Sequence, residues 1–340
     1  MTVVLSGART FEVAAPTTGP TIAVVIPCFR VAAQLSDVVR SIPRRYAPVI
    51  CVDDASPDDI LGALERLDDP RVVYLRHDLN RGVGGAVMTG WTEALARGAD
   101  IVVKMDGDGQ MRGEQLDALV APVLDGSADV AKGNRFVDHV ELRAMPSSRL
   151  VGNALLSFAV KAVSGYWNVL DPTNGFVAVR SELLHRVDQA WLADGYYFET
   201  SLLVALNVAH VRMADVALPA RYVDAPSSLS VWRVAATFPW LLARSLARRF
   251  YWRYLIEDFG VVSMSVLLGL PLTLFGALFG ALHWVQSVRT GVPATAGTVF
   301  VAALPIILGV QLLLVALVLD VLSSPSIKRG RRAGESANQI

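Results

Sequence analysis

The sequence predicts an α/β fold with a Rossmann-like, mostly parallel sheet flanked by helices, followed by amphipathic interfacial helices and two transmembrane helices. In the first half of the chain, short apolar runs alternate with helix-like stretches. Strands and helices that alternate in this way form parallel sheets joined by crossovers. The mean hydropathy of +0.43 is too high for an ordinary soluble protein, and most of the apolar excess follows residue 258. That concentration indicates membrane spans rather than a larger core.

Four apolar runs are predicted to be the first strands of the sheet. They lie in TIAVVIPCF, APVICVDDASPDD, RVVYLRH and ADIVVKMDGDG, with helices expected between them at Ala32–Ile42, Asp58–Leu67 and Gly85–Arg97. Runs that are apolar at nearly every position suit strands covered on both faces. Because ligands bind at the carboxyl ends of such strands, the exits PCF, VDDASPDD, HDLNRGVGG and DGDGQ are expected to converge on one crevice.

The second half of the predicted domain is less regular. Helices are expected at Gly113–Leu124, Arg149–Ser164 and Tyr196–Asn207. Strands are expected in DVAKGNRF and at the start of RMADVALPARYVDAPSSLS, and VLDPTNGFVAV is predicted to be a loop.

The sequence from residue 231 onward predicts membrane attachment. Residues 231–258 interleave aromatic residues with arginines, as in helices that lie in the lipid headgroup layer; a soluble helix pair packed on the domain is the alternative. Phe259–Leu282 and Thr290–Leu319 contain no charged residue, and each can cross a hydrocarbon core of about 30 Å. Basic residues flank the two spans on their outer sides, which places the large domain in the cytoplasm by the positive-inside rule.

These patterns divide the chain into five parts. They are a flexible N-terminus (1–20), a cytoplasmic domain (21–230), amphipathic membrane-interface helices (231–258), a transmembrane hairpin (259–322, with spans at about 259–283 and 295–320) and a basic cytoplasmic tail (323–340). The N-terminal apolar run is too short for a signal peptide, so we expect that the bulk of the chain is not exported.

Composition narrows the class of partner. Lysine plus arginine and aspartate plus glutamate number 31 each, so no global field favours nucleic acid. The two cysteines, Cys28 and Cys51, end or follow apolar runs. We expect them to be core residues in a reducing compartment rather than a disulfide.

The segment DGDGQ is the main candidate for a metal site. Asp106, Asp108 and Gln110 alternate directly after a predicted strand, and oxygen ligands of this kind suit Mg²⁺ or Mn²⁺ shared with a ligand diphosphate. An EF-hand loop is disfavoured, because that loop needs glycine at its sixth position and glutamate at its twelfth, where this chain has Met111 and Asp117. A solvated turn is the alternative for a lone Asp-x-Asp pair.

Two further strand exits carry groups suited to a ligand. Asp53 and Asp54 can accept hydrogen bonds from a nucleobase or a ribose, or one of them can cap the following helix. The glycines of LNRGVGGAVMTG let backbone approach a ligand closely. Their spacing, counted from Gly82, departs from the dinucleotide-binding fingerprint, and no P-loop lysine follows, which disfavours a dehydrogenase.

Taken together, VVIPCF, VDDASPDD, NRGVGGA and DGDGQ resemble the GT-A catalytic domain of family 2 inverting glycosyltransferases over about residues 21–230. The resemblance implies a nucleotide-sugar donor, a UDP- or GDP-sugar. It also implies that Asp106, Asp108 and Gln110 hold the Mg²⁺ or Mn²⁺ that neutralises charge on the departing nucleoside diphosphate. The residues that would bind the donor are Pro27, Phe29, Asp53, Asp54, Asn80, Gly82, Asp106 and Arg221.

The second half resembles one branch of that family, the polyprenyl-phosphate glycosyltransferases related to dolichol-phosphate mannose synthase. This resemblance implies that Arg135 in KGNRF, with Arg149 and Asn153 in SSRLVGN, binds the acceptor phosphate. Arg149 and Asn153 lie on one face of a predicted helix, and guanidinium and amide groups bind phosphate well. Surface salt bridges are the alternative for both arginines. The loop Asp171–Phe176 matches a family loop near the donor sugar.

Glu199, in GYYFETSLL, falls where other members of the larger family place a catalytic base. The alternative is a helix residue that orients an arginine or the sugar hydroxyls. A phosphate acceptor is already an anion and needs no base, whereas a hydroxyl acceptor needs one. Relatives often carry an acid two residues later, where this chain has Ser201.

The segment LPARYVDAPSSLS resembles the mobile loop that closes over the donor. Arg221 would contact the diphosphate, assisted by Ser227 and Ser228. Val223 and Ser230 stand where relatives usually have glycine and lysine. The Gln-x-x-Arg-Trp motif of processive synthases is missing from SLSVWRV, so a single transfer is expected.

The sequence therefore predicts a metal-dependent hexosyltransferase that moves a sugar from a nucleotide sugar to a polyprenyl phosphate at the cytoplasmic face of the cell (inner) membrane, for cell-envelope glycan or glycolipid synthesis. The candidate catalytic residues are Asp108, Glu199, Arg135 and Arg149, and the two arginines would orient the attacking phosphate. One alternative is transfer to a hydroxyl of a lipid-linked sugar with Glu199 as base. Another is a non-catalytic lipid-binding membrane scaffold. Small residues of the first span, Gly269, Gly276 and Gly280, are compatible with a homo-oligomer.

Overall fold

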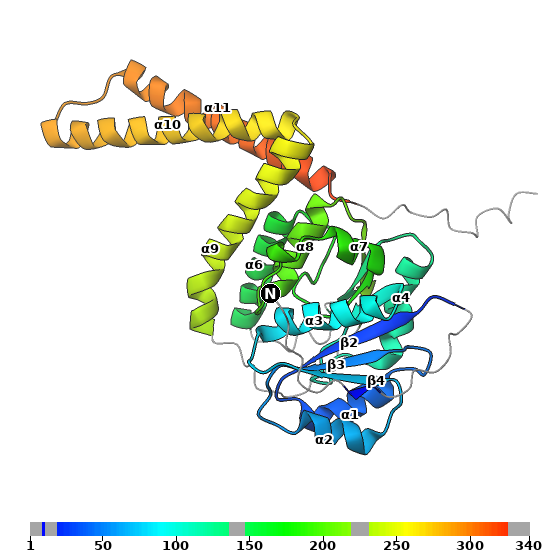
Figure 1. The fold of residues 1–340 in the computed structure, drawn as a ribbon. Helices are drawn as coiled ribbons and strands as arrows, with labels where there is room; N and C mark the ends of the chain where they lie inside the picture. Colours follow the sequence, from blue (N-terminus) through cyan, green and yellow to red (C-terminus); the bar gives the residue numbers. More distant parts are fainter. Residues whose placement is uncertain (1–8, 11–18, 136–146, 219–230, 326–340) are drawn as a thin grey trace, which may run out of the picture. The chain divides into compact units, whose positions relative to one another are not determined.

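The computed structural model of the chain describes residues 9–10, 19–135, 147–218 and 231–325 (Figure 1). The chain divides into two compact units. One unit comprises Met1–Leu246 with Pro325–Ile340, and the other comprises Ala247–Ser324.

The first unit contains an eight-stranded sheet with the strand order β1-β4-β3-β2-β5-β7-β6-β8. Neighbours among β4, β3, β2 and β5 are parallel, as are β6 and β8, whereas β1 is antiparallel to β4 and β7 is antiparallel to β5 and β6. The predicted mostly parallel sheet is therefore confirmed. The strands are β1 (Arg9–Thr10), β2 (Ile22–Cys28), β3 (Val49–Asp53), β4 (Val72–Arg76), β5 (Ile101–Lys104), β6 (Val130–Asn134), β7 (Val177–Arg180) and β8 (Met213–Ala217).

The strand order reverses at β2, which lies between β3 and β5. Open α/β sheets bind ligands in the crevice outside the strand ends at such a reversal. Phe29 follows β2, Asp54 follows β3 and Asp106 lies just after β5. Three of the four predicted exits thus lie at adjacent strand ends, and the fourth follows β4, the next strand along.

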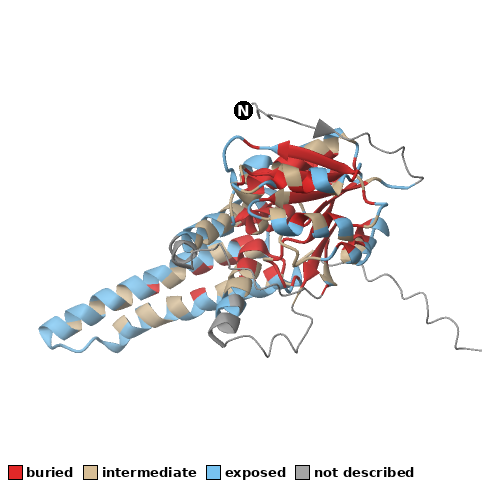
Figure 2. Cartoon of the chain, turned by 90° about the horizontal axis from the view of Figure 1, so that it is seen from below, coloured by how far each residue is buried: buried red, intermediate tan, exposed pale blue. Residues whose placement is uncertain are grey.

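Helices cover both faces of the sheet, because successive strand residues point to opposite faces. Val24 and Ile26 belong to one hydrophobic core and Val25 to the other. The first core takes α1 (Ala32–Ser41), α2 (Ile60–Leu67) and α4 (Leu116–Leu124); the second takes α3 (Gly82–Ala96), α6 (Ser147–Ser164), α7 (Ser181–Arg186) and α8 (Phe198–Val208). In Figure 1, α3 and the α1–α2 pair lie on opposite sides of β2–β4, and the strands between them are buried in Figure 2.

Two elements differ from the sequence prediction. Val177–Arg180, which covers the last three residues of VLDPTNGFVAV and the residue after it, is a strand rather than a loop, because it pairs with both β5 and β6. A run of four residues carries too little periodicity to be recognised alone. Helix α3 begins at Gly82 instead of Gly85. Short 3₁₀ turns, η1 (Gly113–Gln115) and η2 (Gln189–Trp191), precede α4 and α8.

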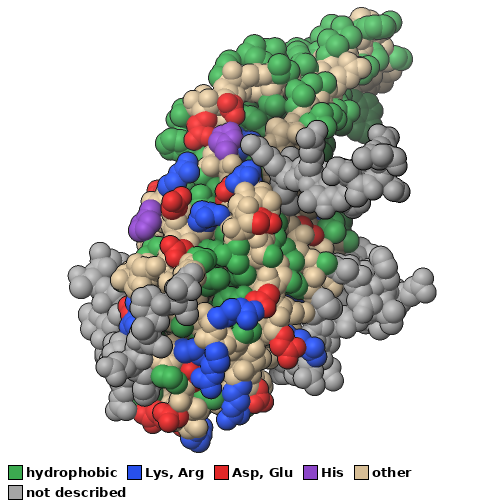
Figure 3. All heavy atoms as spheres, turned by 90° about the vertical axis from the view of Figure 1, so that its right-hand side faces the viewer, with side chains coloured by type: hydrophobic (Ala, Val, Ile, Leu, Met, Phe, Trp, Pro, Cys, Tyr) green, Lys and Arg blue, Asp and Glu red, His purple; other side chains and the backbone are tan. Residues whose placement is uncertain are grey.

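The second unit contains the end of α9 (Val231–Arg249), a π-helical segment η3 (Phe250–Glu257), α10 (Val261–Thr290) and α11 (Ala296–Leu322). Helices α10 and α11 are long and apolar enough to cross a membrane, by length and composition. Their exposed surface is mostly hydrophobic, as the upper part of Figure 3 shows. The two helices pack closely: a Cβ on Gly276 would lie 2.6 Å from the carbonyl oxygen of Ala302.

A buried ion pair ties together the ends of this unit. The Arg249 guanidinium donates to both carboxylate oxygens of Asp320, at 2.8 and 3.0 Å, and the Tyr254 hydroxyl donates to the same carboxylate. All three side chains are buried. An acidic side chain at the end of an apolar helix is costly unless it is paired. These bonds hold the segment around Tyr254 against the last turn of α11.

Candidate active site

Asp53, at the end of β3, is fully buried and bonded to its own chain. Its carboxylate accepts a hydrogen bond from the backbone N–H of Ser56 at 2.7 Å and from the Tyr74 hydroxyl at 2.8 Å. Burial, together with the bond to Asp53, raises the pKa of Tyr74 to about 12. Arg76 lies 3.4 Å from the same carboxylate and is half exposed. Asp53 therefore fixes the turn after β3, and its charge holds the Arg76 guanidinium near the ends of the strands.

Asp54 organises the start of α3. One oxygen accepts from the backbone N–H of Arg81 at 2.8 Å and the other from that of Gly82 at 2.7 Å. The ring of His77 bridges the Asp54 carboxylate, 2.8 Å from Nδ1, and the Thr89 hydroxyl of α3, 2.9 Å from Nε2. Asp54 and His77 are both buried. The carboxylate thus bonds to protein groups that fix the loop between β4 and α3.

The glycines at the start of α3 face the chain itself. The N–H groups of Gly84 and Gly85 donate to the carbonyl of Asp194, at 2.7 and 3.1 Å. A Cβ on Gly82 would lie 2.6 Å from that same oxygen, and Gly82 has a φ of +81°. The glycines therefore allow the loop before α8 to approach closely. The contact of Gly82 with a donor stays a prediction.

Two predicted donor-binding residues at this edge are accessible. Phe29 directly follows β2, the strand that contains Pro27. Its ring is exposed, and the Arg30 guanidinium lies 5.3 Å from the ring centroid. Asn80 is exposed, and its side-chain amide donates to the carbonyl of Asp54 at 3.1 Å. An exposed ring with a neighbouring cation suits stacking by a planar base.

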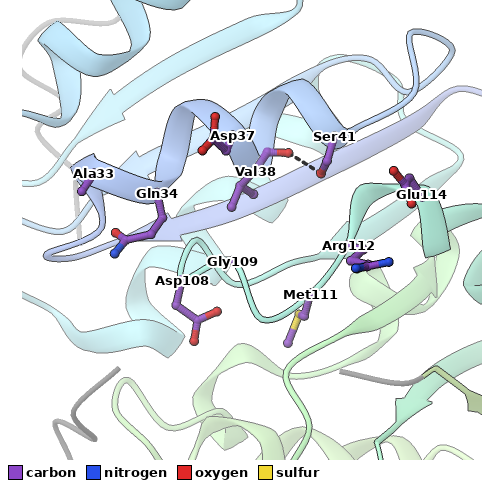
Figure 4. A pocket seen from close by; sticks show the side chains of 10 residues that line it. All are labelled: Ala33, Gln34, Asp37, Val38, Ser41, Asp108, Gly109, Met111, Arg112 and Glu114. Atoms are coloured by element: carbon purple, nitrogen blue, oxygen red, sulfur yellow. Dashed lines mark hydrogen bonds between the residues drawn. The ribbon is translucent and has the colours of Figure 1, made fainter. Parts of the chain in front are cut away.

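Asp106, Asp108 and Gln110 lie on the loop after β5, and each is partly exposed. The Gln110 N–H donates to Asp108 at 3.0 Å, which folds the loop back on itself. Burial raises the pKa of the Asp108 carboxyl; the Gln110 bond opposes this shift and the charge of Asp106 adds to it. Asp108 also lines a cavity of about 560 Å³ between this loop and α1, together with Gln34 and Arg112 (Figure 4).

Lys104, the last residue of β5, connects this loop to α8. Its ammonium lies 2.7 Å from Asp106 and 2.9 Å from Glu199, and its side chain is 1% exposed. Burial by itself lowers the pKa of Lys104, but the charges of Asp106 and Glu199 outweigh that effect and raise it. Gly175 packs on this ion pair so closely that a Cβ would overlap both the ammonium and the Asp106 carboxylate.

The residues of this loop fit a divalent cation. Within the described ranges, no three histidine, cysteine or acidic side chains converge as a complete protein cage. Mg²⁺ and Mn²⁺ need none, since they are held by one or two carboxylates together with substrate phosphates and water. The Asp106 carboxylate is 31% exposed, and Asp108 and Gln110 are partly exposed on the same loop, so their oxygens are accessible to an ion. Asp106, Asp108 and the Gln110 amide are the ligands that such an ion would use.

Arg135, which follows β6, is held by Asp171. Its Nε and one terminal nitrogen donate to the two carboxylate oxygens, at 2.7 and 3.2 Å, and Asp171 is fully buried. The bidentate contact fixes the plane of the guanidinium. Burial raises the pKa of the Asp108 carboxyl, and the charge of Arg135 opposes part of that rise. β6 and β5 both run against β7, so they end at the same edge. The structure thus brings Arg135 to the same region as the loop after β5.

The remaining predicted residues can be placed only in part. Arg149 and Asn153 lie on α6, as expected, but their side chains are outside the described set. Arg221, Ser227 and Ser228 lie outside the described residues. The roles assigned to these residues stay predictions.

Sequence reasoning missed the buried lysines. Lys104 interrupts the apolar run IVVKM, and Lys132 sits in DVAKGN on β6, where its ammonium donates to the carbonyl of Asn174. Burial lowers the pKa of Lys132 to about 8. A charge in a covered strand must find a partner, so each lysine was itself a signal. The identity of one partner, Glu199, 95 residues from Lys104, required the fold.

The fold and the sequence have known counterparts. The profile of the family described as Glycosyl transferase family 2 matches residues 23–188. The crystal structure of glucosyl-3-phosphoglycerate synthase from Mycobacterium tuberculosis with phosphoglyceric acid is similar, with a TM-score of 0.50 and 24% identity over 71% of this chain and 86% of that chain. This likeness concerns the fold alone.

Three curated proteins show the relationship in sequence. Polyprenol monophosphomannose synthase of Mycolicibacterium smegmatis is 33% identical over 53% of this chain and 69% of its own length. Undecaprenyl-phosphate mannosyltransferase of Micrococcus luteus is 32% identical over 52% and 72%. UDP-N-acetylglucosamine–dolichyl-phosphate N-acetylglucosaminyltransferase of Methanococcus voltae is 27% identical over 59% and 85%. The GT-A fold and the enzyme class implied by the sequence are confirmed, and the chain belongs to glycosyl transferase family 2.

Proposed function

We propose that this glycosyltransferase moves one sugar from a UDP- or GDP-sugar to a polyprenyl phosphate, with inversion and with Mg²⁺ or Mn²⁺, at the cytoplasmic face of the cell membrane. The acceptor class is supported by the three relatives, each of which is named for transfer to a polyprenyl or dolichyl phosphate. The observation that carries the proposal is that β5 and β6 end at the same edge of the sheet, which brings the Asp106–Gln110 loop and the Asp171-held Arg135 to that edge.

The donor would lie across the ends of β2, β3 and β5. Phe29 offers its exposed ring to the base, and Asp106 and Asp108 face the diphosphate. A divalent ion held there supplies electrostatic stabilisation of the leaving nucleoside diphosphate. Arg76, drawn to this edge by Asp53, adds a positive charge near the donor.

The acceptor phosphate would be bound by Arg135, Arg149 and Asn153. Asp171 holds Arg135 in one orientation before the acceptor arrives, so less side-chain entropy is lost on binding. The phosphate oxygen is already ionised and attacks the anomeric carbon without a base. Glu199 supports this acceptor over a hydroxyl, because its carboxylate is engaged by the buried ammonium of Lys104.

Membrane attachment would keep the site near its lipid substrate. Helices α10 and α11 are long and apolar enough to span a bilayer. The basic residues that flank them favour a cytoplasmic catalytic domain. A polyprenyl chain can then stay in the bilayer while its phosphate reaches the domain.

The experiment is to incubate the purified full-length protein in detergent with polyprenyl phosphate, MgCl₂ and a panel of UDP- and GDP-sugars. We expect one donor to yield a polyprenyl-phosphate sugar that mass spectrometry detects. Asp108→Asn should lower this activity by more than about 100-fold, as expected when an electrostatic group at the reaction centre is lost. Glu199→Gln should only weaken it.

Two results would contradict the proposal. One is the absence of lipid product with every donor. The other is transfer to a lipid-linked sugar that Glu199→Gln abolishes, because that outcome identifies a hydroxyl acceptor activated by a base.

A further inference from the structure

Lys104 is a buried cation whose role the proposed transfer does not assign. Val102 of β5 belongs to the core shared with α8, and Lys104, two residues on, points to the same face. There it meets Glu199 in the first turn of α8, while Asp106 closes the ion pair from the following loop. The ammonium therefore links the loop of predicted metal ligands to a helix on one face of the sheet.

The charges around Lys104 are unequal. Two carboxylates, those of Asp106 and Glu199, contact one ammonium, and the carboxylate of Asp108 lies on the same loop as Asp106. Two nearby cations have partners of their own, since Lys132 donates to a backbone carbonyl and Arg135 is paired with Asp171. Lys104 is thus the cation in direct contact with Asp106, and its charge opposes that of any metal ion on the same carboxylate.

The packing around this cation is close. The side chain of Lys104 is 1% exposed, and Gly175 approaches both the ammonium and the Asp106 carboxylate so closely that a Cβ would overlap them. A surface lysine can turn into solvent when a metal ion arrives, whereas a buried and packed lysine is held beside its carboxylate. Its charge therefore acts on an ion bound by Asp106.

We propose that Lys104 is a positioning residue that fixes Asp106 and Glu199 and weakens binding of a divalent ion until a donor diphosphate contributes its own negative charge. This inference rests on the proposed function for its link to catalysis, but its effect on metal binding stands alone. The metal would then bind together with the donor rather than before it. Glu199 serves in this arrangement as the second anchor of Lys104.

The test is a titration of the full-length protein in detergent with Mn²⁺ alone, without nucleotide, followed by electron paramagnetic resonance of the unbound ion. Lys104→Met removes the opposing charge while keeping the length of the side chain. We expect Mn²⁺ to bind about tenfold more tightly to this variant, from the loss of one unit charge a few ångströms away. Its kcat should fall at least about tenfold, because Asp106 and Glu199 lose their common anchor.

Two further variants separate charge from structure. Lys132→Met removes an equally buried ammonium that does not contact Asp106, so Mn²⁺ affinity should change by less than about threefold. Lys104→Gln is neutral but keeps hydrogen-bonding capacity, and it should bind Mn²⁺ as tightly as Lys104→Met. If Lys104→Met shows no cooperative thermal transition, and so is not folded, the Mn²⁺ affinity of Lys104→Gln tests the inference instead.

The inference is overturned if folded Lys104→Met or Lys104→Gln binds Mn²⁺ no more tightly than the unmodified protein. The proposed function fails in a different way, by the absence of any lipid product from the unmodified protein. Because the Mn²⁺ titration needs neither sugar nor lipid, each idea can fail while the other stands.

Discussion

Asp171 shows how single residues prepare this site. Asp171 is fully buried in the loop that precedes β7. Its carboxylate accepts two hydrogen bonds from the guanidinium of Arg135. A guanidinium fixed in this way keeps one orientation. If Arg135 binds the acceptor phosphate, the strength of that binding depends on a carboxylate that never touches the lipid.

Asp171→Asn should therefore raise the KM for polyprenyl phosphate by about five- to tenfold, with a smaller effect on kcat, because one of two charge-assisted bonds is lost. Steady-state rates at varied acceptor concentration measure this. The matched control is Asp215→Asn on β8, whose carboxylate pairs with Asn134 instead of an arginine, and its KM should stay within about twofold. An unchanged KM for Asp171→Asn would show that Arg135 does not depend on it.

Lys132 provides a prediction about pH. Its pKa in the folded protein is about 8, lowered by burial, whereas an unfolded lysine titrates near about 10.4. Between these values the unfolded state binds more protons, so the free energy of unfolding rises as the pH rises through that window. Lys132→Met lacks this rise.

We expect the stability of Lys132→Met relative to the unmodified protein to decline by a few kcal/mol at most between about pH 8 and about pH 10. Thermal or denaturant unfolding of both proteins at the two pH values measures the change. The other titrating groups are present in both proteins, so their contributions to the pH dependence of the free energy of unfolding cancel in the difference. A constant difference would mean that Lys132 keeps an ordinary pKa.

At the scale of elements, the contact between α10 and α11 depends on particular glycines. A Cβ on Gly276 would lie 2.6 Å from the Ala302 oxygen and 3.1 Å from the Ile306 nitrogen, both backbone atoms. On Gly280 it would lie 3.2 Å from the Ala302 side chain. The overlap at Gly276 is with backbone and can be relieved only by moving a helix, whereas the contact at Gly280 needs a shift of only a few tenths of an ångström.

Gly276→Ala should therefore destabilise the hairpin by about 1–3 kcal/mol, whereas Gly280→Ala should cost less than about 1 kcal/mol. Thermal unfolding in detergent, followed by far-ultraviolet circular dichroism, compares the two variants. Equal stabilities would show that the helices adjust their distance freely.

The elements differ in how far the sequence could predict them. The runs that became β2, β3, β4 and β5 are apolar at nearly every position and end at polar groups, so both the strands and their shared edge were predictable. β7 was missed because Val177–Arg180 is short, and its position between β5 and β6 depends on pairing with residues far along the chain. The bonds of Asp54 to Arg81, Gly82 and His77 could not be predicted from the sequence, and its contact with a donor stays a prediction.

At the scale of the whole molecule, the membrane orientation can be tested by thiol labelling of single added cysteines, because the chain's own two cysteines are buried. Cys28 and Cys51 are fully buried, so an added surface cysteine dominates labelling by a membrane-impermeant thiol reagent. We expect Ala294→Cys, between the two spans, to be labelled in intact cells. Ser336→Cys, in the basic tail, should be labelled only after permeabilisation. The reverse pattern would place the catalytic domain outside the cytoplasm.

The antiparallel direction of β7 has a consequence for how such enzymes diversify. Because β7 runs against β5 and β6, its entry point lies at the edge where those two strands end. The segment Asp171–Gly175 therefore reaches Arg135, Lys104 and Asp106 without belonging to any strand exit. We therefore expect changes of length or sequence in this one segment to alter the surroundings of Arg135 and Asp106 while the strand exits stay as they are. One side of the site is thus formed by a loop that can vary independently of the parallel strands.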